Sequence, residues 1–180
     1  MLDVTKHFGD TTGGVRTYLL EKARYVASRA GLAHAIVAPG AETSFTDDGG
    51  ARVYRLAGPP VPTQAPYRFL HSSHDVARII AAERPQLIEV GSPFLVPWVV
   101  ERANRAARLP VAWFYHGNVP RLISQNPGHD GLLRAAGHRA AWAYVRRVST
   151  LARATLVTSD FVAADLEAAG VTNVRRVALG

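Results

Sequence analysis

Hydrophobic positions along the chain follow two alternating patterns, one typical of strands and one of helices. Short runs without polar residues, such as 35–38 and 111–115, are typical of strands buried on both faces of a sheet. Between such runs, apolar residues recur every three or four positions, which is the spacing of one helix face. Strands that alternate with helices predict an α/β fold built on a doubly wound parallel sheet.

The first helix is predicted from Gly14 onward, after a short apolar strand at 1–4 and a polar loop. Its apolar stripe consists of Val15, Leu19, Ala23, Val26 and Ala30, and Arg16, Lys22, Arg24 and Arg29 lie outside it. Further helices are predicted after a cap at Ser72 or Ser73, ending before Pro85, and at 94–107, 131–150 and 161–169. Strands are predicted at 35–38, 52–56, 87–90, 111–115, 154–158 and 174–178, a polar loop at 41–50, and a non-helical surface connection at 58–62.

The helix predicted at 131–150 has two different faces. One face is a core stripe of Leu133, Ala136, Ala140, Tyr144 and Val148, continued by Leu151. The other face gathers His138, Arg139, Trp142 and Arg146. A tryptophan among arginines suits an anionic membrane surface, and the alternative is a solvated basic face with Trp142 packed under a loop.

Polar and glycine residues follow several strands that should end at the same edge of the sheet. Ligands of parallel α/β sheets bind at the carboxyl ends of the strands. The loops predicted there are 9–14, 91–93 with Ser92, and 116–118 with His116, Gly117 and Asn118, and Ser159 follows a further strand.

Gly13 and Gly14 stand between the first strand and the first helix. Glycine lets a ligand approach the backbone closely, and the free N–H groups of a helix N-terminus suit a phosphate. The alternative is a tight turn without a ligand. The pair therefore marks a candidate site for a sugar-phosphate or nucleotide.

Three further polar positions have a functional and a structural interpretation. His116 can donate to a sugar hydroxyl or a phosphate, or only cap its own strand. Glu89 can accept bonds from sugar hydroxyls, or pair with an arginine of the fold. Ser159 is first a helix cap. His71 and His74 lack further ligands at metal spacing, so we predict no metal site.

Composition narrows the class of partner. The chain has 180 residues, which suits one domain, and its net charge of +7 favours anionic partners. The arginines are scattered along helices without an aromatic-basic RNA signature, so nucleic acid is not expected. Cysteine is absent, and there is no signal peptide or membrane-spanning run, so we expect a cytoplasmic protein, peripheral at the inner membrane face.

Several runs, taken in chain order, resemble the N-terminal half of a family 4 glycosyltransferase. They are 4–8 with 13–19, 85–90, the strand into His116 and Gly117, 158–161 and 177–180. The resemblance implies a GT-B fold of two Rossmann-like domains and retaining, metal-independent transfer from a UDP- or GDP-linked sugar. It implies that Gly13 and Gly14 lie against donor phosphates and acceptor, that His116 contacts the transferred sugar, and that Arg16 assists an anionic acceptor.

The sequence departs from this family pattern in two respects. Gly117 and Asn118 follow the histidine where relatives commonly have an aspartate or another polar residue. The donor-binding half, with a pair of glutamates eight positions apart, has no counterpart here. We therefore expect residues 1–180 to be a single acceptor-side domain, which needs a C-terminal domain in cis or in trans and is inactive alone.

Two other functions remain open at this point. One is a non-catalytic module that binds an anionic sugar, a lipid or a partner protein. The other is a nucleotide-sugar epimerase of GT-B form, whose resemblance is weaker at Gly13, Gly14 and Val15.

Overall fold

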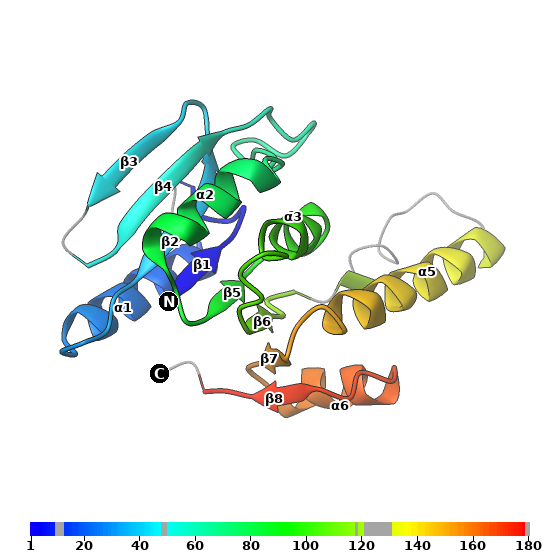
Figure 1. The fold of residues 1–180 in the computed structure, drawn as a ribbon. Helices are drawn as coiled ribbons and strands as arrows, with labels where there is room; N and C mark the ends of the chain where they lie inside the picture. The colour runs from blue at the N-terminus through cyan, green and yellow to red at the C-terminus, as the bar shows by residue number, and fades with distance from the viewer. Residues whose placement is uncertain (10–12, 48–49, 118, 121–130, 179–180) are drawn as a thin grey trace.

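The computed structural model is a three-layer α/β fold around one eight-stranded sheet (Figure 1). It describes residues 1–9, 13–47, 50–117, 119–120 and 131–178, and of residues 131–134 the backbone alone. The spatial order of the strands is β3-β4-β2-β1-β5-β6-β7-β8, and all neighbours are parallel except β3 and β4. The elements are β1 (Leu2–Val4), α1 (Gly14–Ala27), β2 (Ala35–Gly40), β3 (Ser44–Asp47), β4 (Arg52–Ala57), α2 (Ser73–Glu83), β5 (Ile88–Val90), α3 (Leu95–Ala103), β6 (Val111–Phe114), α5 (Gly131–Ser149), β7 (Ala154–Val157), α6 (Asp160–Ala168) and β8 (Val174–Arg176). This arrangement confirms the predicted doubly wound sheet.

Both faces of the sheet are covered, as the run of apolar residues in β2 predicts. Successive side chains of a strand point to opposite faces. Ala35 and Val37 accordingly belong to the larger core, whereas Ile36 and Ala38 pack with Leu19 of α1 in a smaller one. Helix α1 therefore covers one face of the sheet.

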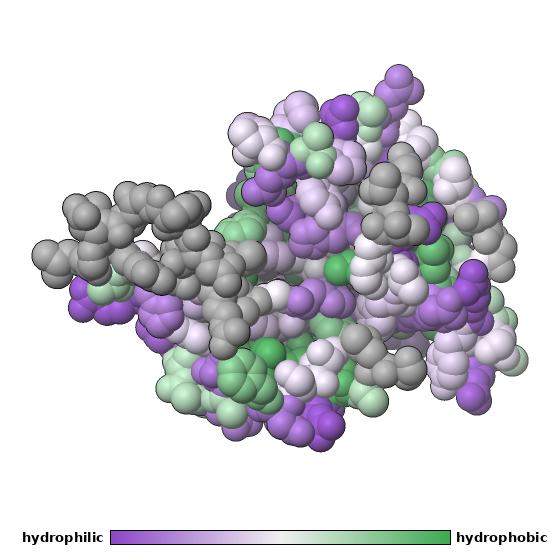
Figure 2. Space-filling model, turned by 180° about the vertical axis from the view of Figure 1, so that it is seen from behind, coloured by the Kyte–Doolittle hydropathy of each residue, from purple (hydrophilic) through white to green (hydrophobic). Residues whose placement is uncertain are grey.

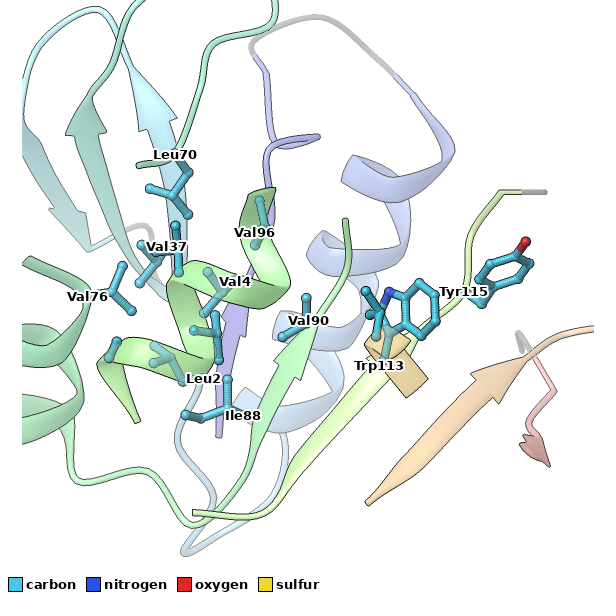
Figure 3. Close-up of a cluster of buried hydrophobic side chains, with 14 of the residues drawn as sticks. Leu2, Val4, Val37, Leu70, Val76, Ile88, Val90, Val96, Trp113 and Tyr115 are labelled. Carbon is cyan, nitrogen blue, oxygen red and sulfur yellow. The ribbon is translucent and has the colours of Figure 1, made fainter. Parts of the chain in front are cut away.

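The larger core lies on the face opposite α1 and receives side chains from α2, α3, α5 and α6. Figure 3 shows its centre, where residues of neighbouring strands meet side chains of the covering helices. Trp113 is its largest fully buried side chain, and its ring contacts that of Tyr115 edge to face, with centroids 5.2 Å apart. Burial of this apolar surface is the main favourable contribution to the stability of the sheet.

The segment predicted as a polar loop at 41–50 contains a strand instead. Residues Ser44–Asp47 form β3, which pairs antiparallel with β4 at the edge of the sheet. All four residues of β3 are exposed, so no hydrophobic pattern marks the strand. Its pairing depends on the neighbouring β4 and on the contact between Phe45 and Tyr54, whose ring centroids are 4.9 Å apart.

Two helices are shorter than the predicted ones. Helix α1 ends at Ala27, so Ala30 is exposed and does not continue the core stripe. Helix α3 covers Leu95–Ala103 rather than 94–107. It ends at Asn104, whose amide side chain donates to the carbonyl of Leu109 (2.8 Å) and accepts from its N–H (3.0 Å). A side chain that satisfies the backbone beyond the helix favours termination there.

The predicted core stripe of α5 is wrong at Ala136 and Ala140, which are exposed, and right at its C-terminal end. Tyr144 packs against the larger core and Val148 is buried, as predicted, and Ala141 and Val145 are buried as well. The helix is rich in alanine on several faces, so the periodicity does not distinguish adjacent stripes. Leu133 lies outside the described side chains.

The surface and the helices give no sign of a membrane span. None of the described helices is both long and apolar enough to cross a membrane. Figure 2 shows hydrophilic side chains over much of the visible face, with hydrophobic ones scattered among them. Figure 1 shows that the N-terminal end of α5 extends away from the sheet.

Candidate functional site

Three neighbouring strands of the sheet end at one place, around Gly91. Strands β1, β5 and β6 are adjacent and parallel, so the residues that follow them meet at one edge. A Cβ added to Gly91 would lie 3.5 Å from Thr5 Oγ1, after β1, and 3.6 Å from His116 Nε2, after β6. The predicted convergence of loops therefore occurs for 91–93 and His116, and Thr5 joins them.

Ser92 is a fully buried junction between the ends of β1 and β5. Its hydroxyl oxygen lies 2.8 Å from Thr5 Oγ1 and 3.1 Å from His7 Nδ1, and accepts from the N–H of Lys6 at 2.9 Å. A buried hydroxyl with three partners fixes the backbone around it. The predicted binding residue Ser92 thus orients the rim rather than facing solvent.

His7 extends from this junction and is a neutral imidazole near neutral pH. Burial, together with the charge of Lys6, lowers the pKa of His7 to about 4, against the smaller opposite effect of a backbone hydrogen bond to Gly91. The edge of its ring contacts Tyr67, with centroids 5.4 Å apart. A neutral imidazole offers one N–H donor and one acceptor nitrogen.

His116 is held at the same edge by aromatic side chains. Its ring stacks on Phe114, with centroids 4.1 Å apart and planes 7° from parallel, and its edge contacts Tyr18. Burial lowers the pKa of His116 to about 4, and the charge of His7 acts in the same direction. Its Nε2 is buried and has no hydrogen-bond partner within the described part of the chain. Buried polar atoms are nearly always paired, so this nitrogen is a candidate ligand contact.

Gly13 and Gly14 lie where the glycine pair was predicted, at the exposed N-terminal end of α1. Gly13 is the N-cap residue, and no side chain caps the helix there. A Cβ added at either glycine would meet no described atom within 4 Å. Both positions are therefore open, and the first N–H groups of α1 receive no bond from a capping side chain.

Glu89 lies beneath α1 and is not exposed at the rim. Its carboxylate pairs with Lys22, Nζ to Oε2 at 2.8 Å, and accepts from the hydroxyl of Tyr18 at 3.1 Å. Of the two interpretations of Glu89, the structure agrees with an ion pair within the fold, but the partner is a lysine and not the predicted arginine. Lys22 also pairs with Asp3 at 3.0 Å, and its side chain is 12% exposed, although the sequence pattern placed it outside the core face.

The charges in this cluster shift one another's protonation. Burial and the nearby Asp3 raise the pKa of Glu89 to about 7, against the opposite effect of Lys22. Burial alone would raise the pKa of Asp3 too, but the hydrogen bond from His34 and the charge of Lys22 hold it below its ordinary value. Because the ring of Tyr18 also contacts His116, this cluster supports one side of the histidine site.

Arg16 lines a cavity to which neither His7 nor His116 contributes. Its guanidinium lies over the ring of Phe8, 5.7 Å from the centroid, and its Nε is buried without a partner among the described residues. The cavity measures about 500 Å³ and includes Arg24 and Arg55. The structure thus places Arg16 near the rim, but on the α1 face of β2 and β4.

The remaining predicted rim residues have simpler surroundings. Gly117 is exposed, and nothing described lies within 4 Å of a Cβ added there. Asn118 lies outside the described residues. The hydroxyl of Ser159 accepts from the N–H of Val162 at 3.3 Å, so the predicted helix cap of α6 is confirmed.

The predicted basic face of α5 lines a cavity of about 620 Å³ between α5 and α6. His138, Arg139, Trp142 and Arg146 all contribute, and Asp165 of α6 lies opposite them. Trp142 is half-buried and packs against the larger core. The arginines are exposed, so any anion at this face would meet them first.

The described residues contain no group of three or more histidine, cysteine, aspartate or glutamate side chains that could hold a metal ion. His71 and His74 are both exposed on the approach to α2 and in its first turn.

Sequence reasoning did not single out five residues of the site. Thr5, Lys6 and His7 contact Ser92, and Tyr18 and Lys22 contact Glu89. The first three directly follow the first strand, and polar residues at such a position were the available signal. Nothing in the local sequence shows that Lys22 turns inward, because its carboxylate partners are distant in the chain.

Solved structures of glycosyltransferases share this fold. Sucrose-phosphate synthase from Thermosynechococcus elongatus matches 99% of the chain with a TM-score of 0.72 and 15% identity. UGT73P12 from Glycyrrhiza uralensis, complexed with glycyrrhetinic acid 3-O-monoglucuronide, matches 99% with a TM-score of 0.56 and 11% identity. An α,α-trehalose-phosphate synthase (UDP-forming) from Burkholderia xenovorans, in complex with glucose-6-phosphate, matches 92% with a TM-score of 0.56 and 13% identity.

The chain spans about half the length of these structures. The match covers 48% of the first, 48% of the second and 41% of the third. No curated protein sequence matches the chain. The sequence model of Glycosyltransferase Family 4 matches residues 12–180. The fold and this match over nearly the whole length show that the chain belongs to Glycosyltransferase Family 4.

Proposed function

We propose that this chain is the acceptor-binding side of a retaining glycosyltransferase, which transfers mannose or glucose from a nucleotide-sugar to a lipid or glycan acceptor. The observation that carries the proposal is the pair of neutral histidines at the carboxyl ends of β1 and β6. A neutral imidazole can both donate to and accept from sugar hydroxyls, and it adds no charge to the site. Membership of a glycosyltransferase family supports the reaction class.

In this proposal the work is divided between two Rossmann-like domains. This chain forms one wall of the cleft, with His116 facing the transferred sugar and the open N-terminus of α1 at Gly13 and Gly14 near the donor phosphates. A second domain, in the same polypeptide or a separate one, holds most of the UDP or GDP and stabilises it as leaving group without a metal. Mixed with UDP-glucose or GDP-mannose and acceptor sugars, the 180-residue chain alone is expected to show no turnover.

The histidine signals in a proton NMR titration test the binding role. The chain is titrated with glucose, mannose, UDP and GDP while the imidazole signals of His7 and His116 are followed. The expected result is that a hexose shifts both signals, because its hydroxyls reach the unpaired Nε2, and that UDP and GDP bind weakly. His116→Ala should remove hexose binding, and His74→Ala, which changes an exposed histidine on α2, should not.

Other outcomes would contradict this division. Tight nucleotide binding by the chain alone would move the donor site to Gly13 and Gly14. No response to any sugar or nucleotide would favour the alternative, a non-catalytic module that recognises a different anionic ligand or a partner protein.

We also propose that the α5–α6 cavity contacts anionic lipid at the inner membrane face. The supporting observation is the pair of exposed arginines, Arg139 and Arg146, which line one cavity beside Trp142. Co-sedimentation with anionic liposomes should be lost in Arg139→Glu with Arg146→Glu. Unchanged sedimentation of this double variant would refute the membrane contact, and the exposed substitution Arg105→Glu is the control for net charge.

A further inference from the structure

Lys6 lies beside two aromatic rings, close to His7. Its Nζ lies 5.6 Å from the centroid of Phe94 and 5.9 Å from that of Tyr67, which are cation–π distances. Both rings are also open to solvent, Phe94 by 45% and Tyr67 by 37%. The three side chains thus combine a positive charge with two exposed aromatic surfaces.

No acidic side chain neutralises Lys6 within the described part of the chain. Its ammonium takes part in no hydrogen bond or ion pair there, although the residue is half-buried. Partial burial of an unpaired ammonium lowers the pKa of Lys6. Partial desolvation of a charge without a partner costs folding energy, and an anionic ligand would supply the partner that the described residues do not.

The backbone presents Phe94 in an unfavourable conformation. Its φ is 68° and its ψ is −110°, a region that bulky residues rarely adopt. The hydroxyl of Tyr144, on α5, accepts from the N–H of Phe94 and donates to its carbonyl oxygen at 3.1 Å. The two rings stack with centroids 5.9 Å apart. Such conformations persist where the surroundings enforce them, and they gather at binding sites.

Lys6 lies next to His7 of the histidine site. Lys6 is adjacent to His7, and the ring of His7 contacts Tyr67. The backbone N–H of Lys6 donates to Ser92, which also binds His7 Nδ1. A ligand hydrogen-bonded to the imidazole of His7 would therefore lie beside Lys6 and Tyr67.

We infer that Lys6, Tyr67 and Phe94 select an acceptor sugar that carries a phosphate group. The apolar C–H face of a sugar ring packs against an exposed aromatic ring. The ammonium of Lys6 pairs with the phosphate, and the imidazoles bind the hydroxyls of the same ring. This inference rests on the proposed acceptor-binding function and names the chemical class of the acceptor.

The chain contains two lysines, which makes NMR a direct test. With ¹³C-labelled lysine, the ε-methylene signal of Lys6 is assigned by its loss in Lys6→Gln. The probes are glucose, glucose 6-phosphate and inorganic phosphate, and the histidine signals are recorded in the same titration. Glucose 6-phosphate should bind at least about tenfold more tightly than glucose, because its phosphate gains a charge-assisted contact.

Two variants separate the charge from the aromatic surface. Lys6→Gln should reduce the affinity for glucose 6-phosphate to that for glucose and leave glucose binding unchanged. Phe94→Ala should weaken both sugars by a similar factor. The control Arg105→Gln removes one charge on an exposed side chain just beyond α3, at the opposite edge of the sheet, and should change neither affinity.

The outcomes distinguish this inference from the function on which it rests. Equal binding of the two sugars, or a preference that survives Lys6→Gln, would overturn the role of Lys6 and leave the acceptor function intact. Inorganic phosphate that binds as tightly as glucose 6-phosphate would show a simple anion site and overturn the selection of a sugar. Absence of any sugar binding would overturn the acceptor function and this inference together.

Discussion

The two lysines of the chain lie on either side of the same strand end and have opposite surroundings. Lys22 reaches under α1 and pairs with two buried carboxylates, those of Asp3 and Glu89. Lys6 follows β1 and has aromatic rings as neighbours but no carboxylate among the described residues. Their pKa values move in opposite directions. Burial alone would lower the pKa of both lysines, but Asp3 and Glu89 raise that of Lys22 above its ordinary value, whereas that of Lys6 stays lowered.

We expect the stability of the fold to depend on the charge of Lys22 and not on that of Lys6. Removal of Lys22 would leave the buried side chains of Asp3 and Glu89 without the cation that they share, whereas Lys6 has no carboxylate partner among the described residues. Substitution of Lys22 should therefore lower the stability of the protein, whereas substitution of Lys6 should change ligand binding.

Lys22→Met should lower the free energy of unfolding by about 3–5 kcal/mol, the usual cost of removing one partner of a buried ion pair. Urea denaturation at pH 7 measures the change. Arg24→Met is the matched control, because Arg24 is an exposed cation on the same helix and forms its ion pair with exposed Glu21. A loss for Lys22→Met no larger than for the control would show that the buried cluster does not need its cation.

The raised pKa of Glu89 should make stability depend on pH. Between the ordinary value of 4.5 and the folded value of about 7, the folded state holds more protons than the unfolded state. Stability from this group is therefore fully present below pH 4.5 and is lost as the pH rises through 7. The free energy of unfolding of the wild type, measured relative to that of Glu89→Gln, should fall by on the order of 2 kcal/mol between pH 5 and pH 8.

The other titrating groups do not obscure this comparison. His7 and His116 have lowered pKa values and act in the opposite direction, but they are present in both proteins. The lowered pKa of Asp3 places its effect below this pH range. Parallel stability curves for the wild type and Glu89→Gln in urea denaturation would mean that Glu89 titrates normally.

Tyr18→Phe should reduce stability by about 1 kcal/mol, because Glu89 loses a hydrogen-bond donor but keeps its lysine. The ring that contacts His116 remains. Thermal or urea unfolding measures the effect, and Tyr25→Phe, at an exposed position of the same helix, should have none. Identical stabilities of the two variants would remove Tyr18 from the network.

Lys6→Gln should change the free energy of unfolding by less than about 0.5 kcal/mol, as for most substitutions away from paired groups. The measurement is urea denaturation beside Lys22→Met. A destabilisation comparable to that of Lys22→Met would make Lys6 a structural residue and erase the contrast between the two lysines.

Much of the fold could be predicted from local pattern. Strands at 35–38, 52–56 and 111–115 and the Ser72 and Ser159 caps are found close to their predicted positions, because buried parallel strands and capping residues have clear local signals. The exposed edge strand β3 was missed, because its pairing supplies its stability and its own residues show no apolar pattern.

The candidate site was predicted in part. The position of His116 and Ser92 after neighbouring strands placed them at one edge, and Gly91 indeed lies between Thr5 and His116. Glu89 was predicted to bind sugar hydroxyls or to pair with an arginine, and it lies under α1, paired with Lys22, because its side chain faces that side of the sheet. Successive side chains of a strand point to opposite faces of the sheet. The local sequence does not show which of the two faces α1 covers, so it does not place Glu89 under that helix.

The sequence by itself determined the alternation of strands and helices, the parallel sheet and the family, because these depend on periodicity and on motifs that are local in the chain. Only the tertiary structure decided which lysine is paired. Asp3, Lys22 and Glu89 are far apart in the sequence and meet because two neighbouring strands and one helix bring them together. The exposure of Lys6 to a ligand, beside rings from two other segments, has the same origin. The sequence shows which residues are charged, but whether a charged side chain affects stability or ligand binding depends on the neighbours that folding brings to it.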